Sequence, residues 1–266
     1  MRTIRLTLEY DGTRYAGWQS QKKMPSSATG HGIRTIQEEI EARLKRLIGQ
    51  EVPVICAGRT DAGVHALGQV AAFRAAAGPH LPPDVLKKAL NAMLPEDIRI
   101  LEAADCPADF HPRHDAVKKT YFYLIAMTPY PPVFMRRYAW GIPWRLDLEA
   151  MREASAFITG KKDFSAFRAS GCGSKTPVKE VFSIEITGME EISFLTAGLK
   201  GEFIRITITA DAFLRHMCRN IVGTLLLAGR GRIEPGALSR IIESGDRRLA
   251  GPTAPALGLF LERVYY

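Results

Sequence analysis

The order of strand-like and helix-like patterns in the first part of the chain limits the fold most. Three stretches alternate apolar and polar residues, as half-buried strands do, and a fourth strand-like stretch holds the apolar run Val70–Phe73. Two others have helical spacing, and the first of these opens with a capping box at Thr35. In chain order the elements are a strand at 4–10, a helix after 35, strands at 52–56 and 67–74, a helix at 85–93 and a strand from 98. This order predicts a split βαβ domain of the ferredoxin-like kind.

The rest of the chain has a similar content of elements. A strand is expected at 118–125, and residues 129–144 then hold four prolines, which break any regular pattern. The later elements are a helix capped by Asp147, strands at 182–186 and 204–208, helices at about 213–228 and from 235, and a strand at 257–261. We therefore predict an α+β fold with two ferredoxin-like halves and a central cleft. The halves are residues 1–128 and 147–266, with a Pro-rich connection at 129–146.

Composition narrows the class of partner. The chain has 266 residues, 46% of them hydrophobic, and a formal net charge of +8. Such a charge favours an anionic partner, with nucleic acid first and an acidic membrane surface second, although solubility alone also produces it.

The cysteines, the histidines and the apolar runs exclude other classes. The four cysteines are far apart, and the HxxH spacing of His111 and His114 has no further ligand cluster, so we expect no metal site. The amino terminus begins a strand and has no signal-peptide core. The run from Ile221 to Ala228 is too short to span a bilayer. We therefore expect a cytoplasmic protein without a membrane segment.

One loop has the composition of a chemical site. Residues 56–66 (CAGRTDAGVHA) lie between two predicted strands and hold a single carboxylate, Asp61, two residues after Arg59. Gly58 and Gly63 flank this carboxylate and permit unusual backbone geometry or the close approach of another molecule. The loop is either a tight turn with a local arginine–aspartate pair or a site that aims an ionised carboxylate at one atom.

Six separated stretches together resemble one family. They are residues 10–19, 58–65 (GRTDAGVH), 121–123 (YFY), 163–167 (DFSAF), 213–223 (FLRHMCRNIVG) and 256–259 (ALGL). In this order they are similar to the motifs of the tRNA pseudouridine synthase A family. The resemblance covers nearly the whole chain. The chain departs from the family in the long polar loop at 21–32 and at Thr120, where a basic residue is common, and both departures bear on how RNA docks.

The resemblance implies an isomerase that converts uridine to pseudouridine at positions 38–40 of the tRNA anticodon stem-loop. It also implies a homodimer and no cofactor. Asp61 corresponds to the catalytic aspartate, which either attacks C1′ of the ribose as a nucleophile or removes a ribose proton to start an elimination. Tyr121 corresponds to the tyrosine that stacks on the target uracil. For Tyr123 we favour a packing role.

Three further residues correspond to substrate-binding positions. Arg59 matches the residue that helps to turn the base out of the stack, Arg219 the arginine that pairs with the catalytic aspartate, and Leu259 the apolar residue beneath the base. Taken without the family, Arg215 and Arg219 would be the solvated basic face of a helix, Tyr121 a cross-strand packing aromatic, and Leu259 a core leucine.

Two other functions fit parts of the sequence. A non-catalytic RNA-binding protein with ferredoxin-like domains would carry aromatics in the RNP pattern on its sheet, and no such motif occurs. An RNA hydrolase that uses Asp61 would need a cluster of carboxylates or histidines, which the sequence does not suggest.

Overall fold

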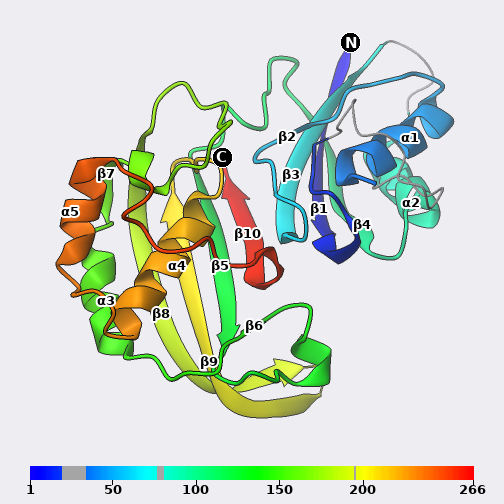
Figure 1. Cartoon of the computed structure of the whole chain (residues 1–266). Helices are drawn as coiled ribbons and strands as arrows, with labels where there is room; N and C mark the ends of the chain where they lie inside the picture. The colour runs from blue at the N-terminus through cyan, green and yellow to red at the C-terminus, as the bar shows by residue number, and fades with distance from the viewer. Residues whose placement is uncertain (20–33, 77–80, 195) are drawn as a thin grey trace, which may run out of the picture. The chain divides into compact units, whose positions relative to one another are not determined.

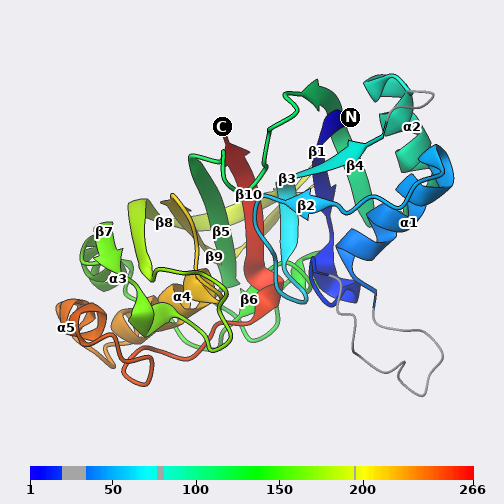
Figure 2. The ribbon, with the colours of Figure 1, turned by 90° about the horizontal axis from the view of Figure 1, so that it is seen from above.

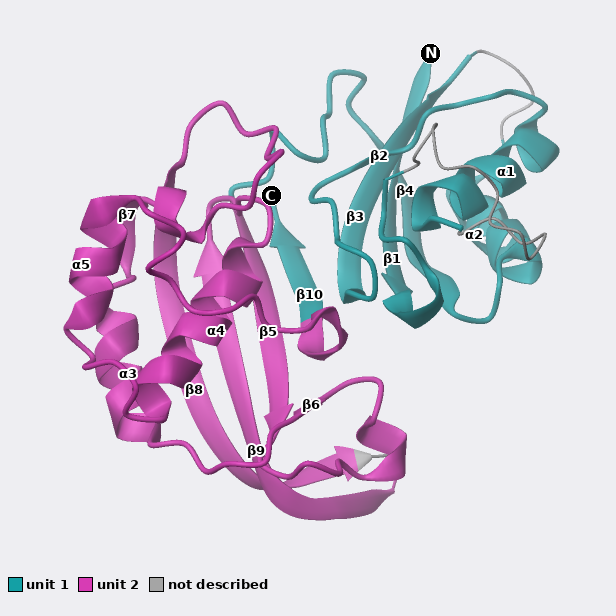
Figure 3. Ribbon diagram, in the orientation of Figure 1, with its two compact units in different colours: residues 1–117, 260–266 teal, residues 118–259 magenta. Residues whose placement is uncertain are grey.

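The computed structural model describes residues 1–19, 34–76, 81–194 and 196–266. The chain forms two compact units (Figure 3). Unit 1 comprises Met1–Val117 and Phe260–Tyr266, and unit 2 comprises Lys118–Leu259. Both contain helices and a sheet, so the predicted α+β class is confirmed. The loop predicted at 21–32 lies outside the described residues.

The compact units divide the chain at other points than the predicted halves. The first boundary follows Val117, before the strand that we assigned to the N-terminal half, and the Pro-rich stretch 129–146 lies inside unit 2. The last residues, from Phe260 onward, belong to unit 1. Compact units are not the same as independently folding domains, so the predicted domain limits stay a prediction.

Unit 1 contains a split βαβ arrangement. Its elements are β1 (Arg2–Tyr10), α1 (Ile36–Ile48), β2 (Ile55–Cys56), β3 (His65–Ala75), α2 (Pro83–Met93), β4 (Ile98–Cys106) and β10 (Leu259–Tyr265, of which residues from Phe260 lie in this unit). β1 lies between β4 and β3 and pairs with both in the antiparallel sense. β2 pairs antiparallel with β3, and both helices lie together on one face of the sheet (Figures 1 and 2). This is the strand order that the sequence pattern predicts for a ferredoxin-like domain.

The alternation in β1 fixes which side of that sheet is covered. Ile4, Leu6 and Leu8 are buried, whereas Arg5 and Thr7 on the opposite face are partly exposed. The apolar faces of α1 and α2 are also buried; they comprise Ile36, Ile40, Leu44, Leu86 and Leu90. Removal of this apolar surface from water is the main force that forms unit 1.

Unit 2 repeats the order strand, helix, strands, helix. Its elements are β5 (Lys118–Ala126), β6 (Trp140–Gly141), α3 (Leu148–Ala156), β7 (Gly160–Asp163), β8 (Val178–Phe194), β9 (Ala197–Ala210), α4 (Met217–Gly229) and α5 (Ala237–Ser244). The sheet runs β5-β9-β8-β7 with antiparallel neighbours, and β6 pairs parallel with β5. α3 contacts both α4 and β8. Short 3-10 turns occur at Gly12–Arg14, Val133–Met135, Ser165–Phe167 and Ala256–Gly258.

Several predicted limits were wrong. β2 covers only Ile55 and Cys56 of the predicted strand 52–56. α4 begins at Met217, because His216 has a left-handed backbone with φ 61° that interrupts the helical turn. β8 and β9 extend well beyond the apolar cores at 182–186 and 204–208 (Figure 1).

Candidate active site

The loop between β2 and β3 holds Asp61 at a turn. Gly63 has φ 78°, a conformation that favours glycine, and the N–H of Val64 donates to the Asp61 carbonyl at 3.1 Å. Thr60 and Val64 are buried, Asp61 is partly exposed and Arg59 is exposed. The loop thus anchors the residues next to Asp61, which is itself partly exposed.

A buried network of uncharged groups fixes Thr60. The hydroxyl groups of Tyr10 and Thr60 lie 2.8 Å apart. The side-chain amide of Gln69 donates to the Tyr10 hydroxyl at 3.3 Å and to the Gly58 carbonyl at 2.7 Å. Burial raises the pKa of Tyr10 beyond its usual range, so the phenol stays protonated. The network therefore reaches the loop on both sides of Arg59 without a charged group.

A second support comes from Gly17 and Trp18, which follow the 3-10 turn Gly12–Arg14. The Trp18 N–H donates to the Thr60 carbonyl at 3.0 Å. Gly17 has φ 92°, and a Cβ at this position would lie 2.5 Å from the same carbonyl oxygen. The carbonyls of Gly17 and Trp18 accept from the N–H groups of Ile36 and Gln37 in the first turn of α1. N–H groups in the first turn of a helix have no acceptor within the helix. In α1 they bond instead to the Gly17–Trp18 segment, which in turn bonds to Thr60.

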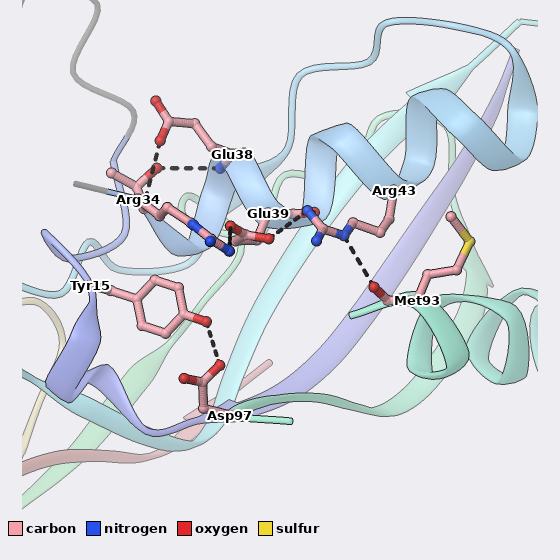
Figure 4. A network of polar contacts seen from close by, with 8 residues as sticks. Tyr15, Arg34, Glu38, Glu39, Arg43, Met93 and Asp97 are labelled. Atoms are coloured by element: carbon pink, nitrogen blue, oxygen red, sulfur yellow. Dashed lines mark hydrogen bonds and ion pairs between the residues drawn. The ribbon is translucent and has the colours of Figure 1, made fainter. Parts of the chain in front are cut away.

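Charged side chains fix the start of α1 in turn (Figure 4). Glu39 is buried and lies between Arg34, at 3.3 Å, and Arg43, at 2.5 Å. Arg43 also donates to the Met93 carbonyl at 3.2 Å, which ties α1 to the end of α2. The capping box at Thr35 is present with both of its hydrogen bonds, as predicted. The support of Asp61 therefore extends through α1 into the core of unit 1.

The turn after β1 approaches the loop from its other end. The Gly12 N–H donates to His65 Nδ1 at 3.1 Å, and a Cβ on Gly12 would lie 2.0 Å from the Val64 carbonyl oxygen. His65 is buried and stacks on Phe260 of β10 with ring centroids 4.6 Å apart. The Asp11 carboxylate lies 3.1 Å from the same Nδ1. His65 therefore connects three chain segments at the root of the loop.

The two tyrosines of β5 have different surroundings. Tyr121 is buried, lies opposite Ile208 of β9, and contacts the Phe213 ring edge-on at 4.9 Å. The Tyr123 hydroxyl donates to the Pro255 carbonyl at 2.7 Å, and burial raises the pKa of Tyr123 beyond its usual range. Tyr123 therefore has a packing role, which is the role that the sequence favours.

Arg219 lies in the first turn of α4. Its Nε donates to the Ala254 carbonyl at 2.7 Å, while the Ala254 N–H donates to the Arg219 carbonyl at 3.1 Å. Arg219 is partly exposed. The helix macrodipole makes a cation in the first turn unfavourable by about 0.3–1 kcal/mol. The hydrogen bonds between Arg219 and Ala254 offset this unfavourable interaction. Arg215 precedes the helix and donates to the Ser170 carbonyl at 2.9 Å, so the predicted shared helix face was wrong.

Leu259 ends the segment that begins at Ala254. It is buried and follows the 3-10 turn Ala256–Gly258. A Cβ on Gly258 would lie 2.6 Å from the Leu124 carbonyl oxygen, so this turn packs closely on β5. The structure thus brings Arg59 and Asp61 together in one loop of unit 1, and it connects Arg219 and Leu259 through one segment of unit 2.

Sequence reasoning assigned no supporting role to the residues whose side chains hold Thr60 and the segment around Ala254, which are Tyr10, Gln69, Asn220, Thr253 and Arg247. Tyr10 and Asn220 do lie within the motifs at 10–19 and 213–223. Two of them carried a usable signal: Gln69 interrupts an apolar strand, and Asn220 lies in an apolar helix. A polar side chain in an apolar element is expected to have a specific partner.

Other kinds of site find little support. Among the described residues, no group of three or more His, Cys, Asp or Glu side chains could hold a metal ion. None of the four cysteines forms a disulfide, and burial raises the pKa of Cys56, at the start of the loop, to about 12, which keeps this thiol unreactive. No helix in the described part of the chain is long and apolar enough to cross a membrane.

Comparison with known proteins identifies the family. A family profile described as tRNA pseudouridine synthase matches residues 7–115 and 154–266. The chain belongs to the tRNA pseudouridine synthase family. Proteins named "tRNA pseudouridine synthase A" are 42% identical in Thermodesulfovibrio yellowstonii, 42% in Acetivibrio thermocellus and 43% in Moorella thermoacetica. Each match covers all 266 residues of this chain and the full length of the relative.

Membership in the tRNA pseudouridine synthase family confirms the resemblance seen in the six motifs. It also confirms the reaction class, an isomerisation of uridine to pseudouridine in tRNA. The comparisons concern whole chains and assign no role to a single residue.

Proposed function

We propose that this isomerase modifies uridines at positions 38–40 of the tRNA anticodon stem-loop and that Asp61 is its catalytic residue. The observation that carries the assignment of Asp61 is the contrast within one loop. The neighbouring Thr60 is buried and bonded to Tyr10 and Trp18, whereas the Asp61 side chain is partly exposed. A carboxylate held in this way has a fixed direction and access to a substrate.

The reaction activates one carbon, C1′ of the ribose, and leaves the elemental composition of the nucleotide unchanged. The N1–C1′ bond of uridine breaks, the uracil turns, and C5 bonds to C1′. The C5 proton leaves the base and N1 gains a proton, so product and substrate are isomers. The Asp61 carboxylate either attacks C1′ and is later displaced by C5, or removes a ribose proton and starts an elimination.

Four other side chains complete the proposal. Tyr121 stacks on the uracil and assists proton transfer, and Leu259 forms an apolar floor beneath the base. Arg59 is exposed next to the catalytic residue and helps to turn the base out of the stack, because a base inside a helix is inaccessible. Arg219 supplies a guanidinium that stays charged throughout the reaction.

The net charge of +8 fits a tRNA partner. The family resemblance further supports a cytoplasmic location and a homodimer. Light scattering of the purified protein tests the dimer directly.

The decisive experiment uses Asp61→Asn and tRNA labelled with tritium at uridine C5. Isomerisation must release this tritium into water. The variant keeps the size of the side chain but loses the nucleophile and the base together, so release should fall below detection while filter binding of tRNA persists. Asp109→Asn, an exposed carboxylate in unit 1, is the matched control and should release tritium normally. Substantial turnover by Asp61→Asn would move the catalytic role to another residue.

A paired substitution tests the tyrosines of β5. Tyr121→Phe should fold and bind tRNA but release tritium about 10²- to 10⁴-fold more slowly if its hydroxyl carries a proton. Tyr123→Phe loses the bond to Pro255, so it should lower the free energy of unfolding by about 1 kcal/mol with a smaller effect on rate. Single-turnover rates and urea unfolding separate the two, and an unchanged rate for Tyr121→Phe would remove its hydroxyl from the chemistry.

A further inference from the structure

The segment that receives the Arg219 side chain lies unusually close to α4. A Cβ on Gly223 would lie 1.7 Å from the Pro252 carbonyl oxygen, and a Cβ on Gly251 would lie 2.5 Å from the Gly223 carbonyl oxygen. The Gly251 N–H donates to the Thr224 hydroxyl at 2.8 Å. Residues 251–254 therefore lie backbone to backbone against the helix that carries Arg219.

A buried amide organises this contact. Asn220 follows Arg219 in α4 and is fully buried. Its Oδ1 accepts from the Thr253 hydroxyl at 2.6 Å and from Arg247 Nη2 at 2.9 Å, while its Nδ2 donates to the Phe167 carbonyl at 2.8 Å. The amide is thus bonded on both sides, which specifies its orientation.

Arg247 spans the segment with its guanidinium. Nη2 reaches Asn220 and also the Thr253 hydroxyl at 3.1 Å, while Nη1 donates to the Ala250 carbonyl at 3.2 Å. Through these bonds the Arg247 guanidinium holds residues 250–253 against the buried amide of Asn220. Lysine, a point charge on a flexible stem, cannot reproduce this planar set of bonds.

The adjacent arginine shows a different arrangement. Arg248 is exposed and pairs with Asp246 at 2.7 Å. It carries the same charge at the neighbouring position, but its bonds go to an exposed carboxylate that has no connection to Asn220. Arg248 therefore offers a matched control for the charge of Arg247.

We propose that Arg247 is a positioning residue for Arg219. It fixes the segment that carries Ala254 through Asn220 and Thr253, and the Ala254 carbonyl in turn orients the Arg219 guanidinium through its Nε. This inference rests on the role of Arg219 given under the proposed function. Arg247 acts through the position of another side chain and does not contact the reacting atoms.

The test is a double-mutant cycle on the full-length protein with the tritium-release assay in single turnover. Arg247→Ala should slow release by about 10- to 100-fold, the usual cost of a small misplacement in an active site. In an Arg219→Lys background, which keeps the charge but lacks the Nε–H bonded to Ala254, Arg247→Ala should add no further slowing. The melting temperature should fall by a similar amount in both backgrounds, and Arg248→Ala should leave the rate unchanged.

Two outcomes would overturn the proposal. In the first, Arg247→Ala slows both backgrounds by the same factor, which means that it acts independently of Arg219. In the second, it lowers the melting temperature without any effect on rate, which assigns it a structural role alone. Tritium release by the unsubstituted protein tests the reaction itself, so failure of the reaction is distinguishable from failure of this proposal.

A second variant covers the case in which Arg247→Ala does not fold. Thr253→Val keeps the shape of the side chain and removes one hydroxyl from the network. It should slow release several-fold in the Arg219 background and not in the Arg219→Lys background. Equal slowing in both would contradict the proposal in the same way.

Discussion

The loop that carries Asp61 in unit 1 and the segment that carries Ala254 in unit 2 are held by related means. In each, glycines bring two backbones closer than any side chain allows: Gly12 and Gly17 at the loop, Gly223 and Gly251 at the segment. In each, a buried amide is bonded to a hydroxyl group. Close backbone contact leaves little room for displacement, which a site that aims a side chain requires.

The two supports differ in charge. The groups that hold Thr60 directly, Tyr10 and Gln69, are uncharged and buried. The segment of unit 2 is held by the guanidinium of Arg247, which is partly exposed. Solvent and salt screen interactions of exposed charges but hardly affect buried neutral hydrogen bonds. The direct hydrogen bond between Thr60 and Tyr10 should thus be insensitive to ionic strength, whereas the bonds of Arg247 should weaken in salt.

The largest effect is expected from substitutions at the glycines, the feature that both supports share. Gly12→Ala and Gly223→Ala each place a Cβ against a backbone oxygen, at 2.0 and 1.7 Å. Each should lower the free energy of unfolding by about 3 kcal/mol, because backbone cannot move aside as a side chain can. Urea unfolding measures the loss. Gly173→Ala, where no atom lies within 4 Å, is the control and should be neutral.

A smaller effect is expected from Tyr10→Phe, which tests the neutral support alone. The change removes one hydroxyl and leaves Thr60 with one partner fewer, which should cost about 1–2 kcal/mol. Tritium release should slow as the loop loosens, and the slowing should not depend on salt between low and moderate ionic strength. Tyr130→Phe, at a residue that is 86% exposed, should change neither quantity. A strong salt dependence of the Tyr10 variant would contradict the contrast between the supports.

The smallest effect concerns pH and compares one carboxylate from each unit. Partial burial alone would raise the pKa of Asp11, but the imidazole of His65 and the N–H and hydroxyl of Thr13 lower it below its ordinary value. A group with a lowered folded pKa stabilises the protein above its unfolded pKa, here 3.8, and this contribution is lost as pH falls.

Asp11→Asn should therefore reduce stability near neutral pH by about 1 kcal/mol or less and flatten the decline in stability as pH falls below about 5. In unit 2, hydrogen bonds from Arg248 lower the pKa of the exposed Asp246 to about 2. Asp246→Asn should have an effect that disappears in high salt, because the pair is open to solvent. Urea unfolding over this pH range, with and without salt, distinguishes the two carboxylates.

The regular elements were predictable where one face alone is buried. β1, α1 and α3 were predicted closely, because the alternation from Ile4, the capping box at Thr35 and the cap at Asp147 are local signals. The outer parts of β8 and β9 were missed, since Gly188, Glu191 and similar residues there give no apolar alternation. The start of α4 was also missed, because nothing in the composition of residues 213–216 indicates the left-handed turn at His216.

The sequence indicated the motif residues of the candidate site but not the residues that hold them in place. A short motif around Asp61 is readable because its residues are adjacent in the chain. Arg247 lies 27 residues after Asn220, and Thr60 lies 50 residues after Tyr10, so their contacts appear only in the folded chain. Their spacing in the sequence follows no helix or strand period.

The position of β10 has a consequence for the order of events during protein synthesis. Phe260 and Leu261 pair with His65 and Ala66 at the start of β3, directly after the loop that carries Asp61. The ribosome makes residues 118–259 between these two partners. The nascent unit 1 can therefore form β1, β3 and β4 early, but the ring that stacks on His65 arrives only after unit 2 has been translated. The root of the Asp61 loop is completed only after residues 118–259 have been translated, so a polypeptide that stops before Phe260 lacks this part of the site.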